Sequence, residues 1–421
     1  MKNQFKLFLT VISLSLIISS CRDTIIETYM ANVPVYMTYD EFRSSIAVEV
    51  AQDLQNPGKI YFYKNYLFVN EYLKGIHVID NSTPSTPVNL TFISIPGNVD
   101  IAVKDDILYA DSFIDLVSLD ISNIENIQEV DRLESIFPYT LPPFDENYRI
   151  DDVDYEKGIV IDWELKEVTR EVQRRVYPMY YAYEDALSSS GTSGNAVGAS
   201  SFGVGGSMAR FSIIEDYLYA IDNYYLNIID INDIQNMSIL KKINVSWNIE
   251  TIFPYNNTLF IGSQNGMIIY DITDSANPSF ISDYWHITSC DPVVVDDTLA
   301  YVTLRSGNLC GETNDQLDVI NISDLSNPSL VRSYAMENPY GLGIDNKTLF
   351  VCDGNAGLKI FDADDVMKIS ENQIAEFPSI QAFDVIPVNN LLMLIGKDGL
   401  YQYDYSDLKN IRLVSSVTIS N

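Results

Sequence analysis

The chain has 421 residues, 47% of them hydrophobic and 12% aromatic, so it can build one large domain or two ordinary ones and is not intrinsically disordered. Its 58 acidic and 26 basic side chains give a formal charge of −32 at pH 7, which repels nucleic acid and anionic lipid headgroups. We therefore expect no nucleic-acid partner.

The N-terminal residues predict an export signal. Lys2 and Lys6 lead into an apolar run, residues 7–18, that is too short for a comfortable membrane span. The run ends in Ile-Ser-Ser-Cys21, which resembles a bacterial lipobox. We expect residues 1–20 to be removed and Cys21 to be lipidated, with ordinary cleavage nearby as the alternative. Several acyl chains, at about 0.8 kcal/mol per buried CH₂, would anchor the protein in the cell envelope, at the outer membrane or facing the periplasm or surface.

Residues 21–57 are polar and weakly patterned, and we interpret them as a tether between the lipid and a domain that spans residues 58–421. No later segment is long and apolar enough to predict a membrane span.

One unit recurs along this domain: a short apolar strand, a loop, a second strand, and a turn centred on Asp. The second residue of the first strand is a leucine in seven copies, at Leu67, Leu108, Leu218, Leu259, Leu299, Leu349 and Leu392. The separations are 41, 110, 41, 40, 50 and 43 residues. A period of about 40 residues with short strands is typical of β-propeller blades. We predict an all-β propeller of four-stranded blades, and assign the repeated Asp to a backbone-capping turn.

The 110-residue interval contains a further hairpin pattern at residues 149–165, with Ile159 at the leucine position. Counting it predicts eight blades, which is favoured slightly over seven blades with a large insertion. The divergent unit covers residues 140–207 and includes a Gly/Ser-rich stretch, residues 188–207, that predicts an exposed loop. Residues 33–50 are a candidate for the strand that closes the ring.

The repeats also carry a family resemblance. The segments LNIIDI (residues 226–231), IIYDITDSANP (residues 268–278) and LDVINISDLSNP (residues 317–328) resemble the LVIVD repeat of bacterial extracytoplasmic β-propellers. The resemblance covers residues 66–421 and implies the propeller fold. It implies no catalytic residues, because the family has no established common activity.

Binding in propellers usually occurs at the channel mouth, where the innermost strands begin and the second strands end. The repeat alignment places a set of charged and small residues at the beginnings: Lys59, Asp100, Asp151, Arg210, Thr251, Asp291, Gly341 and Asp384. At the ends of the second strands it places Glu71, Asp111, Asp222, Arg305 and Asp353. We take Asp100, Asp111, Asp222, Asp291, Arg305, Asp353 and Asp384 as the candidate ligand-binding face. Such carboxylates suit Ca²⁺ or a cationic ligand, and a solvated acidic rim paired with Lys59, Arg210 and Arg305 is the alternative.

The remaining cysteines and histidines give weaker signals. Cys290 and Cys310 fall in one unit and could form a disulfide in an oxidising compartment, leaving Cys352 odd and buried. A soft-metal site of the cysteines with His286 matches no standard zinc spacing. His77 lies inside an apolar strand and is interpreted as a core residue. We find no motif of a nucleophile, metalloprotease or nucleotide site.

Function is therefore predicted only as a choice between classes. The first hypothesis is a lipid-anchored, non-enzymatic scaffold that binds an envelope protein, glycan or small ligand at its acidic mouth. The second is a propeller hydrolase or lyase that acts on glycans through paired mouth carboxylates. The third is a structural protein that depends on Ca²⁺.

Overall fold

The computed structural model describes residues 24–173, 204–246, 248–264, 266–285, 292–305 and 315–419. The chain divides into two compact units. The smaller comprises Met1–Met37 and Pro142–Ala186, and the larger comprises Thr38–Leu141 and Leu187–Asn421.

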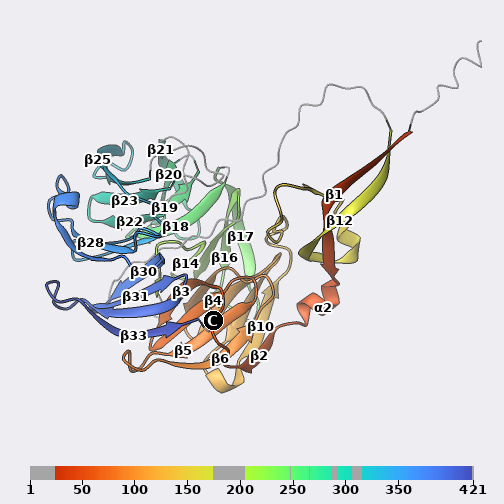
Figure 1. The fold of residues 1–421 in the computed structure, drawn as a ribbon, viewed down its shortest axis with the longest axis horizontal. Coiled ribbons are helices and arrows are strands. Elements are labelled where there is room, and N and C mark those ends of the chain that lie inside the picture. Colours follow the sequence, from red (N-terminus) through yellow and green to blue (C-terminus); the bar gives the residue numbers. More distant parts are fainter. Residues whose placement is uncertain are drawn as a thin grey trace, which may run out of the picture. The chain divides into compact units, whose positions relative to one another are not determined.

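The larger unit consists of blades, each built from four consecutive antiparallel strands, and two further strands join the sheet of blade 1 (Figure 1). Blade 1 contains β3 (Pro57–Tyr63), β4 (Tyr66–Glu71), β5 (Gly75–Asp80) and β6 (Val88–Ser94). Blade 2 contains β7 (Ile101–Lys104), β8 (Ile107–Ser112), β9 (Asp115–Asp120) and β10 (Gln128–Leu133). Blade 3 contains β14 (Phe211–Ile214), β15 (Tyr217–Ile221), β16 (Tyr225–Asp230) and β17 (Ser238–Asn244). Blade 4 contains β18 (Ile249–Tyr255), β19 (Thr258–Ser263), β20 (Gly266–Asp271) and β21 (Ser279–Trp285).

The C-terminal part repeats the same arrangement. Blade 5 contains β22 (Val293–Asp296), β23 (Leu299–Leu304), β24 (Gln316–Asn321) and β25 (Ser329–Ala335). Blade 6 contains β26 (Leu342–Asp345), β27 (Thr348–Cys352), β28 (Leu358–Asp362) and β29 (Gln373–Phe377). Blade 7 contains β30 (Ala382–Val388), β31 (Leu391–Gly396), β32 (Gly399–Asp404) and β33 (Arg412–Thr418).

The innermost strands form a closed ring. Each contacts the next in the order β3, β7, β14, β18, β22, β26 and β30, and β30 contacts β3 again. The prediction of an all-β propeller with seven to eight blades is confirmed, and within the described residues the ring has seven members. The second strands are almost wholly buried, as in β8, whereas outer strands such as β10 are partly exposed. This difference explains why the second strands read as continuous apolar runs.

The segment predicted to give an eighth blade takes a different form. Ile159–Gln173 is one 15-residue strand, β12, in a three-stranded sheet with β1 (Thr24–Met37) and β11 (Arg149–Ile150). A blade needs a turn after Leu165, but residues 159–173 contain no Gly, Pro or Asn to make one. The preference for eight blades is thereby corrected. The tether interpretation is corrected over Thr24–Met37 as well, because β1 pairs with β12 along its whole length.

The repeated Asp forms the predicted turn in every blade. The carboxylate or amide oxygen at the end of the third strand accepts a hydrogen bond from the backbone N–H two residues later, at Asp80, Asp120, Asp230, Asp271, Asn321, Asp362 and Asp404. The structural interpretation of this residue is confirmed. Asn321 replaces Asp without loss of the turn, because an amide oxygen accepts the same bond.

The ring closes through side chains, without a strand shared between the first and last blades. The amides of Asn81 and Gln402 exchange two hydrogen bonds of 2.9 and 2.8 Å between blades 1 and 7, and both side chains are buried. The hydroxyl of Ser415 donates to the carbonyl of Pro84 at 2.6 Å. Residues 33–50 do not close the ring: Ala47–Val50 forms β2, which pairs antiparallel with the outer strand β6.

Candidate functional site

The beginnings of the innermost strands meet a short segment of the chain itself, residues 204–210, which we call the plug. Its first residues form β13 (Val204–Gly205), which pairs with β3 on the channel side of blade 1. The backbone of Ala209 accepts a hydrogen bond from Ile252 in blade 4, and that of Arg210 accepts one from Ile221 in blade 3. Residues 205–209 are buried. The plug therefore spans the channel mouth between blades on opposite sides of the ring.

Two predicted mouth residues bind the plug. The Asp384 carboxylate in β30 accepts hydrogen bonds from the backbone N–H of Ser207 at 3.1 Å and from its hydroxyl at 3.3 Å. The Ser207 hydroxyl oxygen also accepts from the N–H of Leu342 at 2.6 Å. On the other side, the Asp100 carboxylate accepts from the backbone N–H of Arg210. Asp100 and Asp384 thus both accept hydrogen bonds from the backbone of the plug.

Asp100 is also half of a buried ion pair. Its Oδ2 lies 2.7 Å from the Nζ of Lys59, and the two side chains are 2% and 4% exposed. Burial lowers the pKa of Lys59, and the Asp100 carboxylate opposes that shift. The sequence alignment correctly grouped Lys59, Asp100 and Arg210, and the structure brings all three together.

Asp111, at the end of the second strand of blade 2, binds the backbone that precedes β7. Its Oδ1 accepts from the N–H groups of Val99 and Asp100 at 2.7 and 2.9 Å and from the side-chain amide of Asn98 at 2.9 Å. Burial raises the pKa of Asp111 to about 6, although these backbone hydrogen bonds act in the opposite direction. The group is therefore close to half-protonated in mildly acidic solution.

The other predicted carboxylates hold loops of their own blades. Asp222 accepts from the N–H groups of Tyr224 and Tyr225, each at 2.8 Å, and its other oxygen lies 3.3 Å from the Nζ of Lys242. Asp353 accepts from the N–H of Asn338 at 2.8 Å and pairs with Lys359 at 2.6 Å. Asp222 and Asp353 therefore shape the surface around the plug.

Aromatic and cationic side chains also lie at the strand ends and turns of this face. The Arg305 guanidinium lies 3.9 Å from the ring centroid of Tyr340, and the Tyr340 ring packs at 5.4 Å against that of Phe383. In blade 3 the Nζ of Lys242 lies 4.4 Å from the ring centroid of Tyr225. We call this surface, formed by the plug, the starts of the innermost strands and the turns between second and third strands, the plugged face. The candidate residue Arg305 belongs to it through its cation–π contact.

Several predictions cannot be placed. Cys21, Cys290, His286, Asp291 and Cys310 lie outside the described residues. Cys352 is a fully buried free thiol, as expected, and burial raises its pKa well above the usual range. His77 is buried in β5 against Phe92, which confirms its assignment to the core; its Nε2 lies 3.2 Å from Glu71 Oε2.

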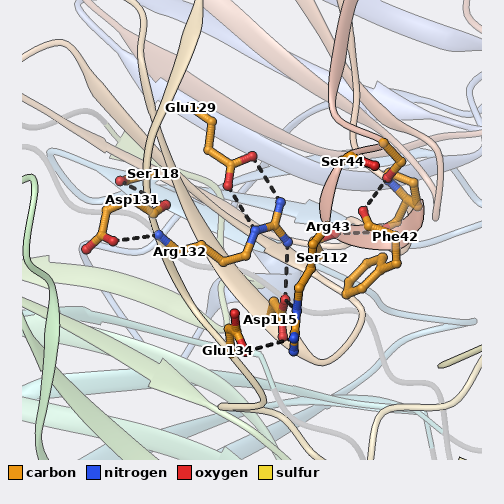
Figure 2. A network of polar contacts seen from close by, with 12 residues as sticks. Phe42, Arg43, Ser44, Ser112, Asp115, Ser118, Glu129, Asp131, Arg132 and Glu134 are labelled. Carbon is orange, nitrogen blue, oxygen red and sulfur yellow. Dashed lines mark hydrogen bonds and ion pairs between the residues drawn. The ribbon is translucent and has the colours of Figure 1, made fainter. Parts of the chain in front are cut away.

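The same face holds a second polar network, which the sequence patterns did not predict. The short helix α2 (Tyr39–Arg43) lies at the turn that precedes β9, where Asp115 is fully buried. Figure 2 shows Asp115 between two guanidinium groups, at 3.0 Å from Arg43 Nε and 3.2 Å from Arg132 Nη1. Arg132 in turn makes two bonds to Glu129. The capping box of Thr38 and Glu41 is a local signal that could have revealed the helix.

In the described part of the chain, no group of three or more His, Cys, Asp or Glu side chains could hold a metal ion. The same residues include no helix of the length and apolarity needed to cross a membrane. The mouth carboxylates Asp100, Asp111 and Asp384 are buried, and each accepts a hydrogen bond from backbone N–H groups.

Comparisons with known proteins agree with the β-propeller fold. The LVIVD repeat model matches residues 205–244, 254–285 and 310–336, so the chain contains LVIVD repeats in a β-propeller. The computationally designed Ika8 protein is 10% identical, with a TM-score of 0.51, and the similarity covers 89% of this chain and 92% of that one. At this identity the likeness shows the fold alone.

Two further solved structures are similar at lower scores. Hsv2 from Kluyveromyces lactis is 10% identical, with a TM-score of 0.48 and coverage of 87% of this chain and 100% of that one. BamB from Moraxella catarrhalis is 9% identical, with a TM-score of 0.47 and coverage of 80% and 81%. No curated protein matches the chain.

Proposed function

We propose that the protein is a non-catalytic scaffold that binds a partner protein on its plugged face. The observation that carries this proposal is a set of half-buried side chains on this face, Tyr224, Arg305 and Tyr340, beside a channel mouth that the plug spans. Tyrosine and arginine are enriched among residues that dominate protein–protein binding energy, because they combine a large apolar area with hydrogen-bonding groups.

The burial of the mouth carboxylates supports a scaffold over a glycan hydrolase or lyase. A glycosidase needs two carboxylates that reach the substrate, one of them able to transfer a proton. Asp100 is 1% exposed and Asp384 is 2% exposed, and each accepts a hydrogen bond from the plug. A substrate would first have to displace the plug from both.

The proposal includes attachment to a bacterial cell envelope through a lipid on Cys21. Its support is the signal pattern of residues 1–20 together with the small residues that precede the cysteine. Labelling cells with an alkyne fatty acid should mark the wild-type protein and leave Cys21→Ala unmarked. Equal labelling of both forms would remove the anchor from the proposal.

The binding proposal is tested by purifying the tagged, full-length protein from gently solubilised envelopes. The wild type should retain a stoichiometric protein partner with and without Ca²⁺, and a Tyr224→Ala/Arg305→Ala variant should lose it. The matched control is Met367→Ala/Leu408→Ala, which truncates two exposed side chains in turns on the opposite face. Loss of the partner in the control alone would place binding elsewhere.

The same preparation distinguishes an enzyme. If the wild type releases reducing ends from envelope glycans and Asp384→Asn stops this release without unfolding the protein, the scaffold proposal is wrong. A scaffold predicts no release by either form.

A further inference from the structure

A groove runs along the outer rim of the propeller between the added strand β2 and blade 2. Its volume is about 320 Å³, within the range of small ligand sites. Ile46 and Val48 line one side, Ile127 and Glu129 line the other, and Ile93 and Leu119 also contribute. The groove lies beside the outermost strands of blades 1 and 2, whereas the plug contacts the innermost strands.

The outermost strand of each blade contributes to the lining of the groove and leaves one strand edge open. β2 is the last strand of the six-stranded sheet of blade 1, and β10 is the last strand of blade 2 (Figure 1). An edge strand presents peptide N–H and C=O groups that can pair with another extended segment. All four residues of β2 are exposed, and Val50 is 84% exposed.

The chain itself shows that these outer edges accept an extra strand. β2 is a separate four-residue segment that adds antiparallel to β6, from Ala47 opposite Ser94 to Val50 opposite Thr91. A further extended segment on β2 would repeat this addition one strand outward. This mode of binding takes its affinity from main-chain hydrogen bonds and its specificity from alternate side chains.

The negative charge of the groove favours a basic sequence in such a segment. Glu125 and Glu129 contribute carboxylates to the lining, and its ten residues include no lysine or arginine. The Glu129 carboxylate is fixed in place by Arg132, whereas Glu125 lies on an exposed turn, η1 (Ile124–Asn126). Successive side chains of a strand point to opposite faces of the sheet, so in a segment of alternating basic and apolar residues every basic side chain could face the groove and its carboxylates.

We propose that this groove is a second binding site, which takes an extended, basic segment of a partner protein as an additional strand on β2. The segment spans about four residues, the length of the open edge. The site is independent of the plugged face, so either can exist without the other.

The test measures fluorescence anisotropy of a labelled hexapeptide of alternating lysine and valine with the full-length protein, at about 50 mM salt where charge attraction is weakly screened. Ala47→Trp fills the groove from an exposed position, and Glu125→Lys reverses its charge. We expect each substitution to weaken binding about tenfold or more. A peptide of alternating glutamate and valine should not bind.

The formal charge of −32 makes a matched control necessary, because any cationic peptide is attracted to this protein. Glu371→Lys makes the same charge change in the exposed turn η3 (Ile369–Glu371) of blade 6, to which no fifth strand is added. It should leave the affinity within about twofold of wild type. Equal weakening by Glu371→Lys and Glu125→Lys, or no binding by the wild type, overturns the proposal.

Amide hydrogen exchange separates strand addition from attachment through side chains alone. Bound peptide should slow exchange in Ala47–Val50. If Tyr224→Ala/Arg305→Ala abolishes peptide binding while Ala47→Trp does not, the peptide occupies the plugged face and the groove proposal fails. If Ala47→Trp abolishes peptide binding but the protein still retains its envelope partner, the two sites are separate, as proposed.

Discussion

Gly206 in the plug and Gly341 before β26 both lie against the carboxylate of Asp384. A Cβ at residue 206 would come within 2.3 Å of Asp384 Oδ2, and one at residue 341 within 2.2 Å of its Oδ1. Neither backbone has a positive φ, so the restriction is one of space alone. The absence of side chains at these two positions lets the plug approach the ring closely enough to form the Ser207 hydrogen bonds.

This close approach predicts the effect of Gly206→Ala. The added methyl group must displace the carboxylate, so we expect a loss of about 2–3 kcal/mol in the free energy of unfolding. Urea denaturation measures the change. In an Asp384→Ala background the clash is absent, so the same substitution should cost much less there, and simple additivity of the two changes would contradict the interpretation.

Asp111 predicts a pH dependence with a definite sign. Its folded-state pKa of about 6 is higher than the value near 3.9 of an unfolded aspartate, so the folded state binds the proton more tightly. Its contribution to stability is fully present below pH 4 and is lost as pH rises from 4 to 6 and beyond. The loss is about 3 kcal/mol at most, at 1.36 kcal/mol per unit of pKa.

Chemical denaturation across pH 4–7 tests this prediction against Asp111→Asn. The variant cannot titrate at this position, so its stability relative to wild type should improve as pH rises. Asp271→Asn is the control, because the hydrogen bonds from Thr273 lower the pKa of Asp271, and its contribution is lost as pH falls instead. The same slope in both variants would show that Asp111 is not the group responsible.

At the scale of elements, the repeat predicts local structure well and the connections between repeats poorly. The strands and their Asx turns follow from patterns within about ten residues, so they are present in all seven blades. The plug is different: Gly205, Gly206 and Ser207 belong to the Gly/Ser-rich stretch, residues 188–207, that was predicted to be an exposed loop, and this prediction is wrong for them because they are buried. Contacts with residues more than 100 positions away, such as Tyr61 and Asp384, determine their location.

The candidate site was also predicted only as far as local sequence patterns allow. The alignment correctly identified the ends of strands that meet at one face, because register within a hairpin is a local property. It could not show that Asp100 and Asp384 bind the plug, so residues expected to meet a ligand proved to be buried. The rings of Tyr224 and Tyr340 could not be recognised in the sequence, since nothing local distinguishes a tyrosine near a strand end from one in the core.

The closure between blades 1 and 7 gives a prediction at this scale. Gln402→Leu removes both hydrogen bonds to Asn81 and leaves a buried amide without its partner, which should cost about 2–4 kcal/mol in unfolding free energy. Thermal and urea unfolding both report this change. Because the loss is at the ring closure, amide exchange in β3 and β33 should accelerate before exchange in the central blades.

The double variant Asn81→Leu/Gln402→Leu provides the control for closure. It removes both polar groups, so no unpaired amide remains, and it should cost less than the sum of the two single changes. If Gln402→Leu is harmless, closure must depend on the apolar contacts between β3 and β30 instead.

At the scale of the whole molecule, the charge of −32 is the dominant electrostatic property. Carboxylates repel one another across the folded surface, and this repulsion is reduced when salt screens it. Many of the acids are nevertheless held by local hydrogen bonds that do not require salt, as at Asp222 and Asp353. Screening should therefore stabilise the fold moderately without being required for it.

We predict that the Tm rises by about 2–5 °C when sodium chloride is increased from about 10 to 300 mM, because screening is strong at the higher concentration. The hypothesis of a Ca²⁺-dependent protein makes a different prediction, since a specific site would distinguish Ca²⁺ from Mg²⁺ by size and coordination. Differential scanning fluorimetry in calcium chloride, in magnesium chloride at the same concentration, and in EDTA separates the two. The scaffold proposal predicts the same Tm in both divalent salts. A higher Tm in calcium alone, reversed by EDTA, would instead establish a specific calcium site and make the metal part of the folded protein.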